Sequence, residues 1–187
     1  MVDSETRWRL ARKLRAKPAP EPEPVLIRAA EQADLPAIRD IYNFFIQNTV
    51  ITFDDKPLDL SYWQGRFELL SKHSLPFIVL CRGSEVLGFA YVAPWRMRTG
   101  YLKIVENSIY LTPAATGKKL GSLLFSHLLD ACREVGIREV IAVIADRGAS
   151  ASIALHKRHG FVEQGHLANV AVRFGRPIGS HLLALKL

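Results

Sequence analysis

The sequence predicts an α+β fold, in which a mixed, mostly antiparallel sheet is flanked by helices in three layers. Two observations carry this prediction. Residues 77–93 contain two apolar runs on either side of Arg82-Gly83-Ser84, which is typical of an antiparallel hairpin. Residues 104–159 then alternate strand-like and helix-like segments, the pattern of a β-α-β-α unit. The 187 residues, of which 49% are hydrophobic, are enough for one domain with a sizeable core.

The elements before the β-α-β-α unit follow from local pattern. A strand begins at Ile27, and the next helix is expected over 33–47, where Asp34 caps apolar residues at near-helical spacing. Residues 60–72 predict a second helix. The hairpin of residues 77–93 follows, and its strands end at the Gly83 turn.

The β-α-β-α unit itself begins with a strand rich in β-branched and aromatic residues. Its expected elements are a strand over 104–111, a helix from Ser122 to Val135, a strand over 140–144 and a helix over 149–159. Gly160 closes the last helix, and the chain returns as a strand from Phe161.

The stretch from Val105 to Phe125 joins an apolar strand to a helix through a turn that contains glycine and lysine. The first backbone N–H groups of a helix have no internal partner, and the helix dipole adds about half a positive charge there. A phosphate or pyrophosphate is therefore stabilised at such a turn, and Lys118 and Lys119 reinforce the field. Taken alone, the pattern also fits a plain strand-to-helix turn.

Composition restricts the class of partner. The 25 Lys and Arg residues outnumber the 18 Asp and Glu residues, and the formal net charge of +7 suits an anionic cofactor and an acidic small substrate. No zinc-finger, RNP or basic-zipper pattern is present, so we expect no nucleic-acid partner. Cys81 and Cys132 suggest reduced thiols in the cytoplasm, and no apolar run reaches transmembrane length.

Residues 1–24 differ from the rest, because basic residues are followed by four prolines interspersed with glutamate. This composition predicts a basic N-terminal tail and stiff linker, with residues 25–187 forming the single domain. Residues 4–17 also fit a short basic helix in which Trp8 anchors a partner, nucleic acid or membrane surface. An Arg-rich targeting sequence is a further alternative.

A series of motifs runs in order between Ile27 and Leu187. They are IRAAEQADLPAIRDIYN, TFDDKP, GFAYVAPWRMRTGY, VENSIYL, GSLLFSHLL, SIALHKRHGF and VRFGRP. This series resembles the GCN5-related N-acetyltransferase (GNAT) family, and most of all its phosphinothricin and methionine sulfoximine N-acetyltransferase subgroup. The resemblance implies a GNAT-type α/β/α fold and direct transfer of an acetyl group from acetyl-CoA to the amine of a small anionic amino-acid analogue. It also makes a homodimer the expected assembly.

The resemblance implies two catalytic residues. Glu106 occupies the position of the proposed general base, and burial in an apolar strand would raise its pKa toward a range suited to taking a proton. Glu106 also fits a strand-end acid paired with an arginine. His156 occupies the position of the general acid that protonates the departing thiolate, although a helical histidine is often a structural hydrogen-bonder. We expect no metal at His156 and His159, because zinc needs three or four converging ligands.

The resemblance places acetyl-CoA along the end of the Glu106 strand and the loop that follows. Backbone N–H groups of residues 108–111 are expected to hold the oxyanion, because such acetyltransferases splay this strand from its neighbour. The expected cofactor-binding residues are Ile109, Tyr110, Leu111, Gly117, Lys118, Lys119, Leu120, Gly121, Ser122 and Ser152.

Three positions at the expected acetyl-CoA site depart from the family pattern, and the usual Trp and Asp near Pro177 and Gly179 are also missing. Thr116 replaces the usual Gln or Arg, Lys119 replaces the first motif glycine, and Ala149 stands near the usual pantetheine-binding Asn. We expect Lys119 to fit, because a residue that starts a helix has negative φ. Loss of the Asn removes a contact of about 1 kcal/mol. These departures motivate an alternative, a non-catalytic acyl-CoA sensor or interaction protein.

The loop over residues 95–101 combines two guanidiniums with aromatic rings. Arginine suits bidentate recognition of carboxylate or phosphinate, and the subgroup has a similar loop. The expected substrate residues are Phe53, Arg96, Arg98, Tyr101 and Ser108. A solvated basic loop is the alternative, and acetylation of a protein or peptide amine is possible if the loop leaves the pocket open.

Overall fold

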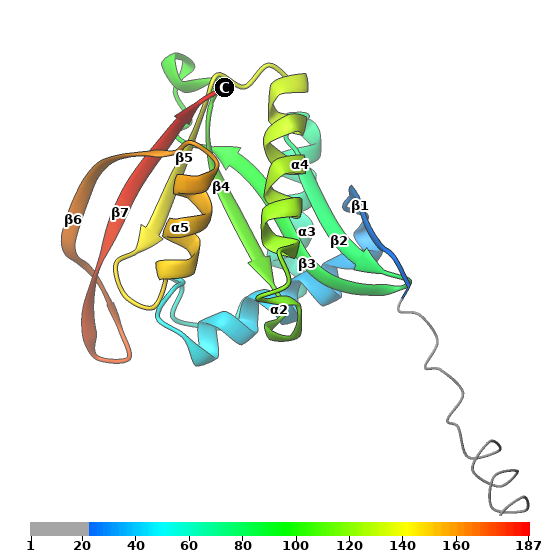
Figure 1. Cartoon of the computed structure of the whole chain (residues 1–187), viewed down its shortest axis with the longest axis horizontal. Helices are drawn as coiled ribbons and strands as arrows, with labels where there is room; N and C mark the ends of the chain where they lie inside the picture. Colours follow the sequence, from blue (N-terminus) through cyan, green and yellow to red (C-terminus); the bar gives the residue numbers. More distant parts are fainter. Residues whose placement is uncertain (1–22) are drawn as a thin grey trace, which may run out of the picture.

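A computed structural model of the protein describes residues 23–187. Within this part of the chain, seven strands form one sheet in the order β1-β2-β3-β4-β5-β7-β6 (Figure 1). Neighbouring strands are antiparallel except β4 and β5, which run parallel. The predicted mixed, mostly antiparallel sheet is therefore confirmed. The predicted tail over residues 1–24 lies, up to residue 22, outside the described residues.

The strands of the sheet are β1 (Val25–Ala29), β2 (Phe77–Arg82), β3 (Glu85–Pro94), β4 (Ile104–Leu111), β5 (Glu139–Ala145), β6 (Val162–Arg173) and β7 (Arg176–Lys186). The α-helices described are α2 (Leu35–Asn48), α3 (Leu60–Lys72), α4 (Leu120–Glu134) and α5 (Ser150–Arg158). Short 3-10 helices are η1 (Gln32–Asp34), η2 (Thr99–Tyr101) and η3 (Pro113–Ala115).

Most predicted elements agree with the structure within two residues, and α3 and β4 have the predicted bounds. The predicted start of α4 at Ser122 is two residues late, because the helix begins at Leu120. Gly121, taken from the sequence as a turn residue, lies inside the first turn of the helix. The helix predicted from residue 33 begins at Leu35 instead, since Ala33 and Asp34 belong to η1.

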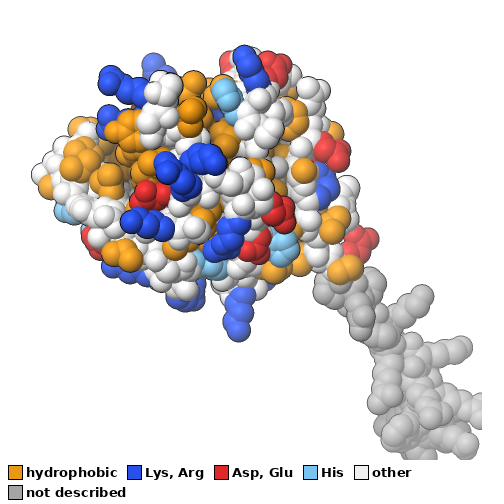
Figure 2. Space-filling view, turned by 90° about the horizontal axis from the view of Figure 1, so that it is seen from above, with side chains coloured by type: hydrophobic (Ala, Val, Ile, Leu, Met, Phe, Trp, Pro, Cys, Tyr) orange, Lys and Arg blue, Asp and Glu red, His pale blue; other side chains and the backbone are white. Residues whose placement is uncertain are grey.

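The β6–β7 hairpin forms one edge of the sheet and stands away from the helices (Figure 1). Most residues of β6 are exposed, including large apolar side chains. Hydrophobic side chains are visible at this end of the molecule, on the left of Figure 2. Pairing of β7 with β5 holds the hairpin in the sheet. Near its turn, the buried Arg173 also donates from Nη2 to the carbonyl of Ile46 near the end of α2.

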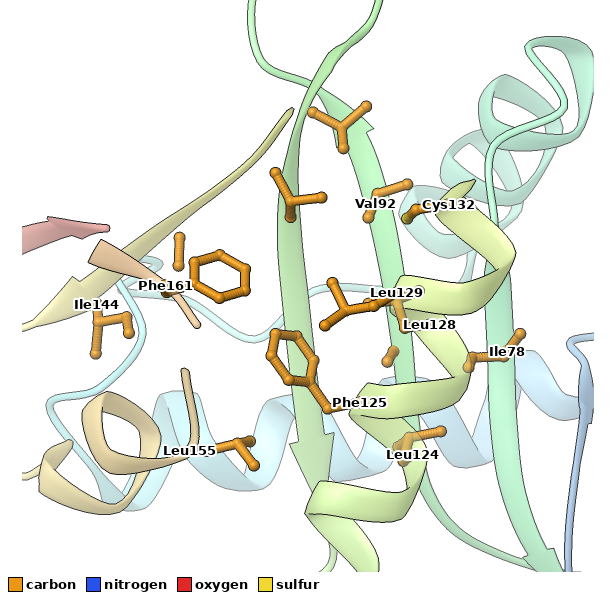
Figure 3. Packing of buried hydrophobic residues seen from close by; sticks show 14 of the residues in the cluster. Ile78, Val92, Leu124, Phe125, Leu128, Leu129, Cys132, Ile144, Leu155 and Phe161 are labelled. Carbon is orange, nitrogen blue, oxygen red and sulfur yellow. The ribbon is translucent and has the colours of Figure 1, made fainter. Parts of the chain in front are cut away.

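Two hydrophobic clusters lie on opposite faces of the sheet and create the predicted three layers. On one face α4 and α5 pack against the sheet, and Figure 3 shows Leu124 and Leu128 of α4 among strand residues such as Val92. On the other face α2 and α3 cover a cluster that includes the fully buried Trp63 and Phe89. Alternate residues of each strand therefore point to different helix layers.

Candidate functional site

The centre of the site is the place where β4 leaves β5. β4 pairs with β3 along its whole length up to Leu111, but it pairs with β5 only from Ile104 to Glu106. β5 continues to Ala145 paired with β7, so the two parallel strands diverge (Figure 1). Along residues 107–111, the edge of β4 that faces β5 has no partner among the described strands. The expected splay is therefore present.

The end of this open edge leads into the start of α4. The turn over residues 116–119 is exposed, and Gly117 has φ +74°. No side chain caps the first turn of α4, so its backbone N–H groups are available to an anion. A Cβ at Gly121 would lie 3.3 Å from Leu111 Cδ1, so a side chain here would crowd the end of β4. This geometry suits a pyrophosphate.

Lys119 corrects one expectation. Its φ is +62°, in the left-handed region, and it is the residue that precedes the first helical residue. The predicted negative φ is wrong because Lys119 is the N-cap, while Leu120 takes the first helical position. A lysine in this conformation costs about 1 kcal/mol relative to glycine, the usual family residue.

Glu106 lies on the face of β4 that looks toward α2 and α3. It pairs with Ala93 on β3, and the same face carries Ser108 and Tyr110, because side chains two residues apart share a face. Burial raises the pKa of Glu106 above its usual value, and the nearby Arg66 guanidinium partly opposes this rise. The carboxylate is therefore a stronger base than an exposed glutamate.

His156 lies on the opposite face of β4. Its Nε2 is 2.9 Å from the amide nitrogen of Asn107, and its Nδ1 is 2.8 Å from the carbonyl oxygen of Ser152. The centres of the Phe125 and Phe161 rings lie 4.6 and 4.9 Å from the centre of the imidazole ring. Glu106 and His156 are thus brought to the same strand from its two sides.

The hydrogen bonds of His156 define its protonation. A carbonyl oxygen only accepts, so Nδ1 carries the proton and Nε2 accepts from Asn107. Burial lowers the pKa of His156 to about 4, which keeps the ring neutral at physiological pH. In this arrangement Nε2 has no proton to donate. Its role as general acid therefore stays a prediction that requires a change of hydrogen-bond partners.

Two predicted cofactor-binding serines lie in the same region. The Ser122 hydroxyl is 2.9 Å from His159 Nε2 and links the start of α4 to the end of α5. Ser152 lies one turn before His156 on α5. Ala149 is buried at the N-cap of α5, where it offers no side-chain hydrogen bond. The start of α5 therefore lacks the side-chain hydrogen-bonding group that the family pattern implies.

The predicted substrate residues divide into two groups. Ser108 faces Tyr91 across the β3–β4 pair, close to Glu106. Arg96 and Arg98 are exposed on the loop between these strands, and the Arg96 guanidinium lies 6.0 Å from the centre of the Tyr101 ring. Phe53 is also exposed, between α2 and α3. Ser108 thus belongs to the Glu106 face, whereas Phe53, Arg96 and Arg98 lie on loops and Tyr101 ends the short helix η2.

Sequence reasoning missed several polar groups around this site. Arg66 and Tyr62 of α3 reach the Glu106 face, and the Tyr42 hydroxyl donates to Asp54. Asn107 has a buried Oδ1 without a partner among the described residues. Tyr62 and Arg66 are spaced i, i+4, which gave a weak signal. Their contact with β3 depends on tertiary packing that local pattern does not reveal.

Between residues 23 and 187, no three His, Cys, Asp or Glu side chains are arranged to hold a metal ion. In the same part of the chain, no helix combines the length and apolar character needed to cross a membrane.

Comparison with known sequences gives a consistent picture. The model of the Acetyltransferase (GNAT) family matches residues 38–161. The phosphinothricin N-acetyltransferase of Alcaligenes faecalis is 34% identical over 157 residues, which cover 84% of this chain and 80% of that protein. The L-methionine sulfoximine/L-methionine sulfone acetyltransferase of Pseudomonas paraeruginosa is 36% identical over 162 residues, covering 86% of this chain and 94% of that protein.

Solved structures agree. A protein of Salmonella typhimurium, determined with its cofactor acetyl-CoA, superposes with a TM-score of 0.85 at 33% identity and covers 88% of this chain and 95% of its own. A phosphinothricin acetyltransferase of Sinorhizobium meliloti in complex with acetyl-CoA gives a TM-score of 0.82 at 36% identity, with 87% of this chain and 88% of that chain covered.

Proposed function

Because this chain belongs to the GNAT family of acetyltransferases and uses acetyl-CoA as its co-substrate, we propose that it acetylates the amine of a small amino-acid-like substrate. Phosphinothricin, methionine sulfoximine and methionine sulfone are the substrates that the relatives' names suggest. Transfer is direct, with both substrates bound together. The observation that carries the proposal is a partly buried glutamate at the point where β4 leaves β5.

The acyl donor is proposed to lie along the open edge of β4 and the start of α4. Backbone groups of Ile109, Tyr110 and Leu111 would take the place of a neighbouring strand, and N–H groups of residues 108–111 would hold the oxyanion. The turn residues would bind the pyrophosphate, and Ser152 would line the side of α5. The proposed pyrophosphate residues are Gly117, Lys118, Lys119, Leu120, Gly121 and Ser122.

The acceptor amine is proposed to approach from the α2 and α3 side. There Glu106 accepts a proton from the ammonium group, and the neutral amine attacks the acetyl carbon. Ser108 lies two residues further along the same face. Phe53, Arg96, Arg98 and Tyr101 would close the pocket from the loops.

His156 is proposed to supply the proton to the departing thiolate from the other face of β4. This role requires the ring to give up its bond to Asn107 and to carry a proton on Nε2. The placement of Glu106 and His156 on opposite faces of β4 supports the assignment. One group can then take the proton of the amine while the other supplies a proton to the thiolate.

We also propose a homodimer that works in the cytoplasm. The exposed apolar side chains of β6, together with its unpaired outer edge, support association through the β6–β7 hairpin. Cys81 and Cys132 are both buried and free, which agrees with a reducing compartment.

A thiol-release assay with acetyl-CoA and a panel of amino acids and analogues tests the function. We expect turnover of phosphinothricin or methionine sulfone, and a loss of about 100-fold or more in kcat/KM in Glu106→Gln. Glu68→Gln on the exposed part of α3 is the matched control and should behave as wild type. Equal turnover by wild type and Glu106→Gln would remove Glu106 from its role, and no turnover on the whole panel would refute the substrate class.

A further inference from the structure

Arg66 is a partly buried cation that the proposed function leaves without a task. It lies on α3, and its guanidinium carbon is 5.3 Å from the centre of the Tyr62 ring and 5.6 Å from that of Tyr91. One Nη2–H donates to the Tyr62 hydroxyl. Because Tyr91 pairs with Ser108 on β4, these rings hold the guanidinium over the strand face that carries Glu106.

The guanidinium has no acidic partner within 4 Å among residues 23–187. It has five N–H donors, and in the described structure the Tyr62 hydroxyl is the one protein acceptor they meet. Arg66 still affects Glu106, since its charge lowers the pKa of that carboxyl. A pre-oriented arginine with free donors is suited to bind an anion in two-point fashion.

The loop arginines differ in this respect. Arg96 and Arg98 are exposed to water, and the Arg96 guanidinium stacks 5.8 Å from the centre of the Trp95 ring. An exposed, solvated cation gives an anion less binding energy than a partly buried one held by aromatic rings. Arg66 is also the arginine whose charge acts on the Glu106 carboxyl, so the Glu106 face has a cation of its own.

We infer that Arg66 binds the carboxylate of the acceptor amino acid and thereby directs its α-amine toward Glu106. The inference rests on the proposed function and names the group that the acceptor must carry. An α-amino acid holds its amine and carboxylate on one carbon, so two protein groups of opposite charge on one face match it. Tyr62 and Tyr91 act as the walls that fix the orientation of the guanidinium.

The test compares L-methionine sulfone with its α-carboxamide, which keeps the amine and loses the carboxylate charge. Wild type, Arg66→Gln, Arg66→Lys and the control Arg133→Gln are assayed. Arg133 lies on α4 in an exposed pair with Asp130. Thiol release gives kcat/KM. Tryptophan fluorescence, to which the buried Trp63 contributes 5.6 Å from Tyr62 between ring centres, gives binding without turnover.

We expect wild type to prefer the acid, and Arg66→Gln to lose about 30–100-fold in kcat/KM and affinity for the acid, with a change below about 3-fold for the amide. Arg66→Lys should retain part of the preference for the acid, and the control Arg133→Gln should retain all of it. Equal losses for acid and amide in Arg66→Gln would overturn the inference, because they indicate a structural role. Loss of the preference in Arg96→Gln or Arg98→Gln, with Arg66→Gln unaffected, would also overturn it.

The fluorescence titration separates this inference from the proposed function. If wild type binds the acid more tightly than the amide but releases no thiol, the activity is wrong and the Arg66 site stands. If wild type acetylates both compounds equally well, the activity stands and the carboxylate site is refuted. Thermal unfolding of each variant identifies a loss of activity that comes from misfolding. If Arg66→Gln does not fold, the same comparison of acid and amide is made with Arg66→Lys.

Discussion

Glu106 and His156 respond to burial in opposite directions, because burial disfavours whichever form of a group is charged. The pKa of Glu106 is raised and that of His156 is lowered to about 4. For Glu106 the shift improves a base that works on one face of β4. For His156 it keeps the ring neutral and bound to Asn107 and to the Ser152 carbonyl. Each shift also has a consequence for the stability of the protein.

Replacing Glu106 by Gln is expected to stabilise the protein at neutral pH. Its folded-state pKa is raised, so a charged carboxylate in the fold costs free energy at pH values above that pKa, and the protein gains stability as pH falls through it. The Tm of Glu106→Gln should therefore exceed that of wild type at pH 7.5, and the difference should shrink toward pH 4.5. A lower Tm for Glu106→Gln at pH 7.5 would contradict this account of the site.

His156 is expected to make the fold sensitive to acid. Its folded-state pKa is about 4 and its usual value is 6.5, so the unfolded chain binds the proton first as pH falls between these values. The contribution of the neutral ring to the free energy of unfolding is full above pH 6.5. About 2 kcal/mol of this contribution is lost between pH 7.5 and 5. Urea denaturation at these two pH values should show a smaller pH effect in His156→Gln. An unchanged pH effect would place the ring in water rather than in the core.

At this scale the sequence allowed part of the site to be predicted. An acid in an apolar strand was recognisable, and burial does raise the pKa of Glu106. Arg66 and Asn107 were not recognisable, because their meaning depends on which face of β3 and β4 each helix covers. That information comes from pairs such as Tyr91 with Ser108, which are distant in the chain.

The entry into α4 is the element whose geometry most affects the proposed donor site. Lys119 keeps a left-handed backbone directly before Leu120, and Gly117 has positive φ two residues earlier. The bounds of α3 were predictable from local pattern, and in the structure Asp59 caps the helix. The end of β2 was predictable because the Gly83 turn follows it. The start of α4 was not, because a lysine with positive φ has no sequence signature.

Lys119→Gly is expected to raise the free energy of unfolding by about 0.5–1 kcal/mol, since glycine adopts positive φ without the Cβ penalty. Lys118→Gly is the matched control, because Lys118 is not among the residues with positive φ and glycine should destabilise it. Chemical denaturation of both variants gives the comparison. Destabilisation of equal size in both would show that the φ of Lys119 carries no strain.

Across the whole molecule, the sheet has two very different edges. β1 forms one edge and the long, exposed β6 forms the other, with Val172 67% exposed. The three layers were predictable from the alternation of strands and helices. The placement of β7 between β5 and β6 was not, because pairing between distant strands leaves no local pattern.

Val172→Glu is expected to convert the proposed homodimer into a monomer, because a charge on the β6 face opposes burial against a second copy. Sedimentation velocity should show a halved mass. Leu26→Glu on β1, also exposed, is the control for the other edge and should remain dimeric. A monomeric wild type, or dissociation of Leu26→Glu alone, would show that β6 is not the interface.

The three residue pairs that join β4 to β5 also divide the sheet into two halves, β1 to β4 and β5 to β7. Amide hydrogens of residues 107–111 that face the divergence should exchange rapidly with deuterium in the free protein. Acetyl-CoA at 100 times its dissociation constant should slow this exchange and add about 2.7 kcal/mol to unfolding. Exchange that stays fast when ligand is added would argue against binding there. On this view the acyl donor supplies the hydrogen bonds that β5 does not make to residues 107–111, and it joins the two halves of the sheet where β4 and β5 separate.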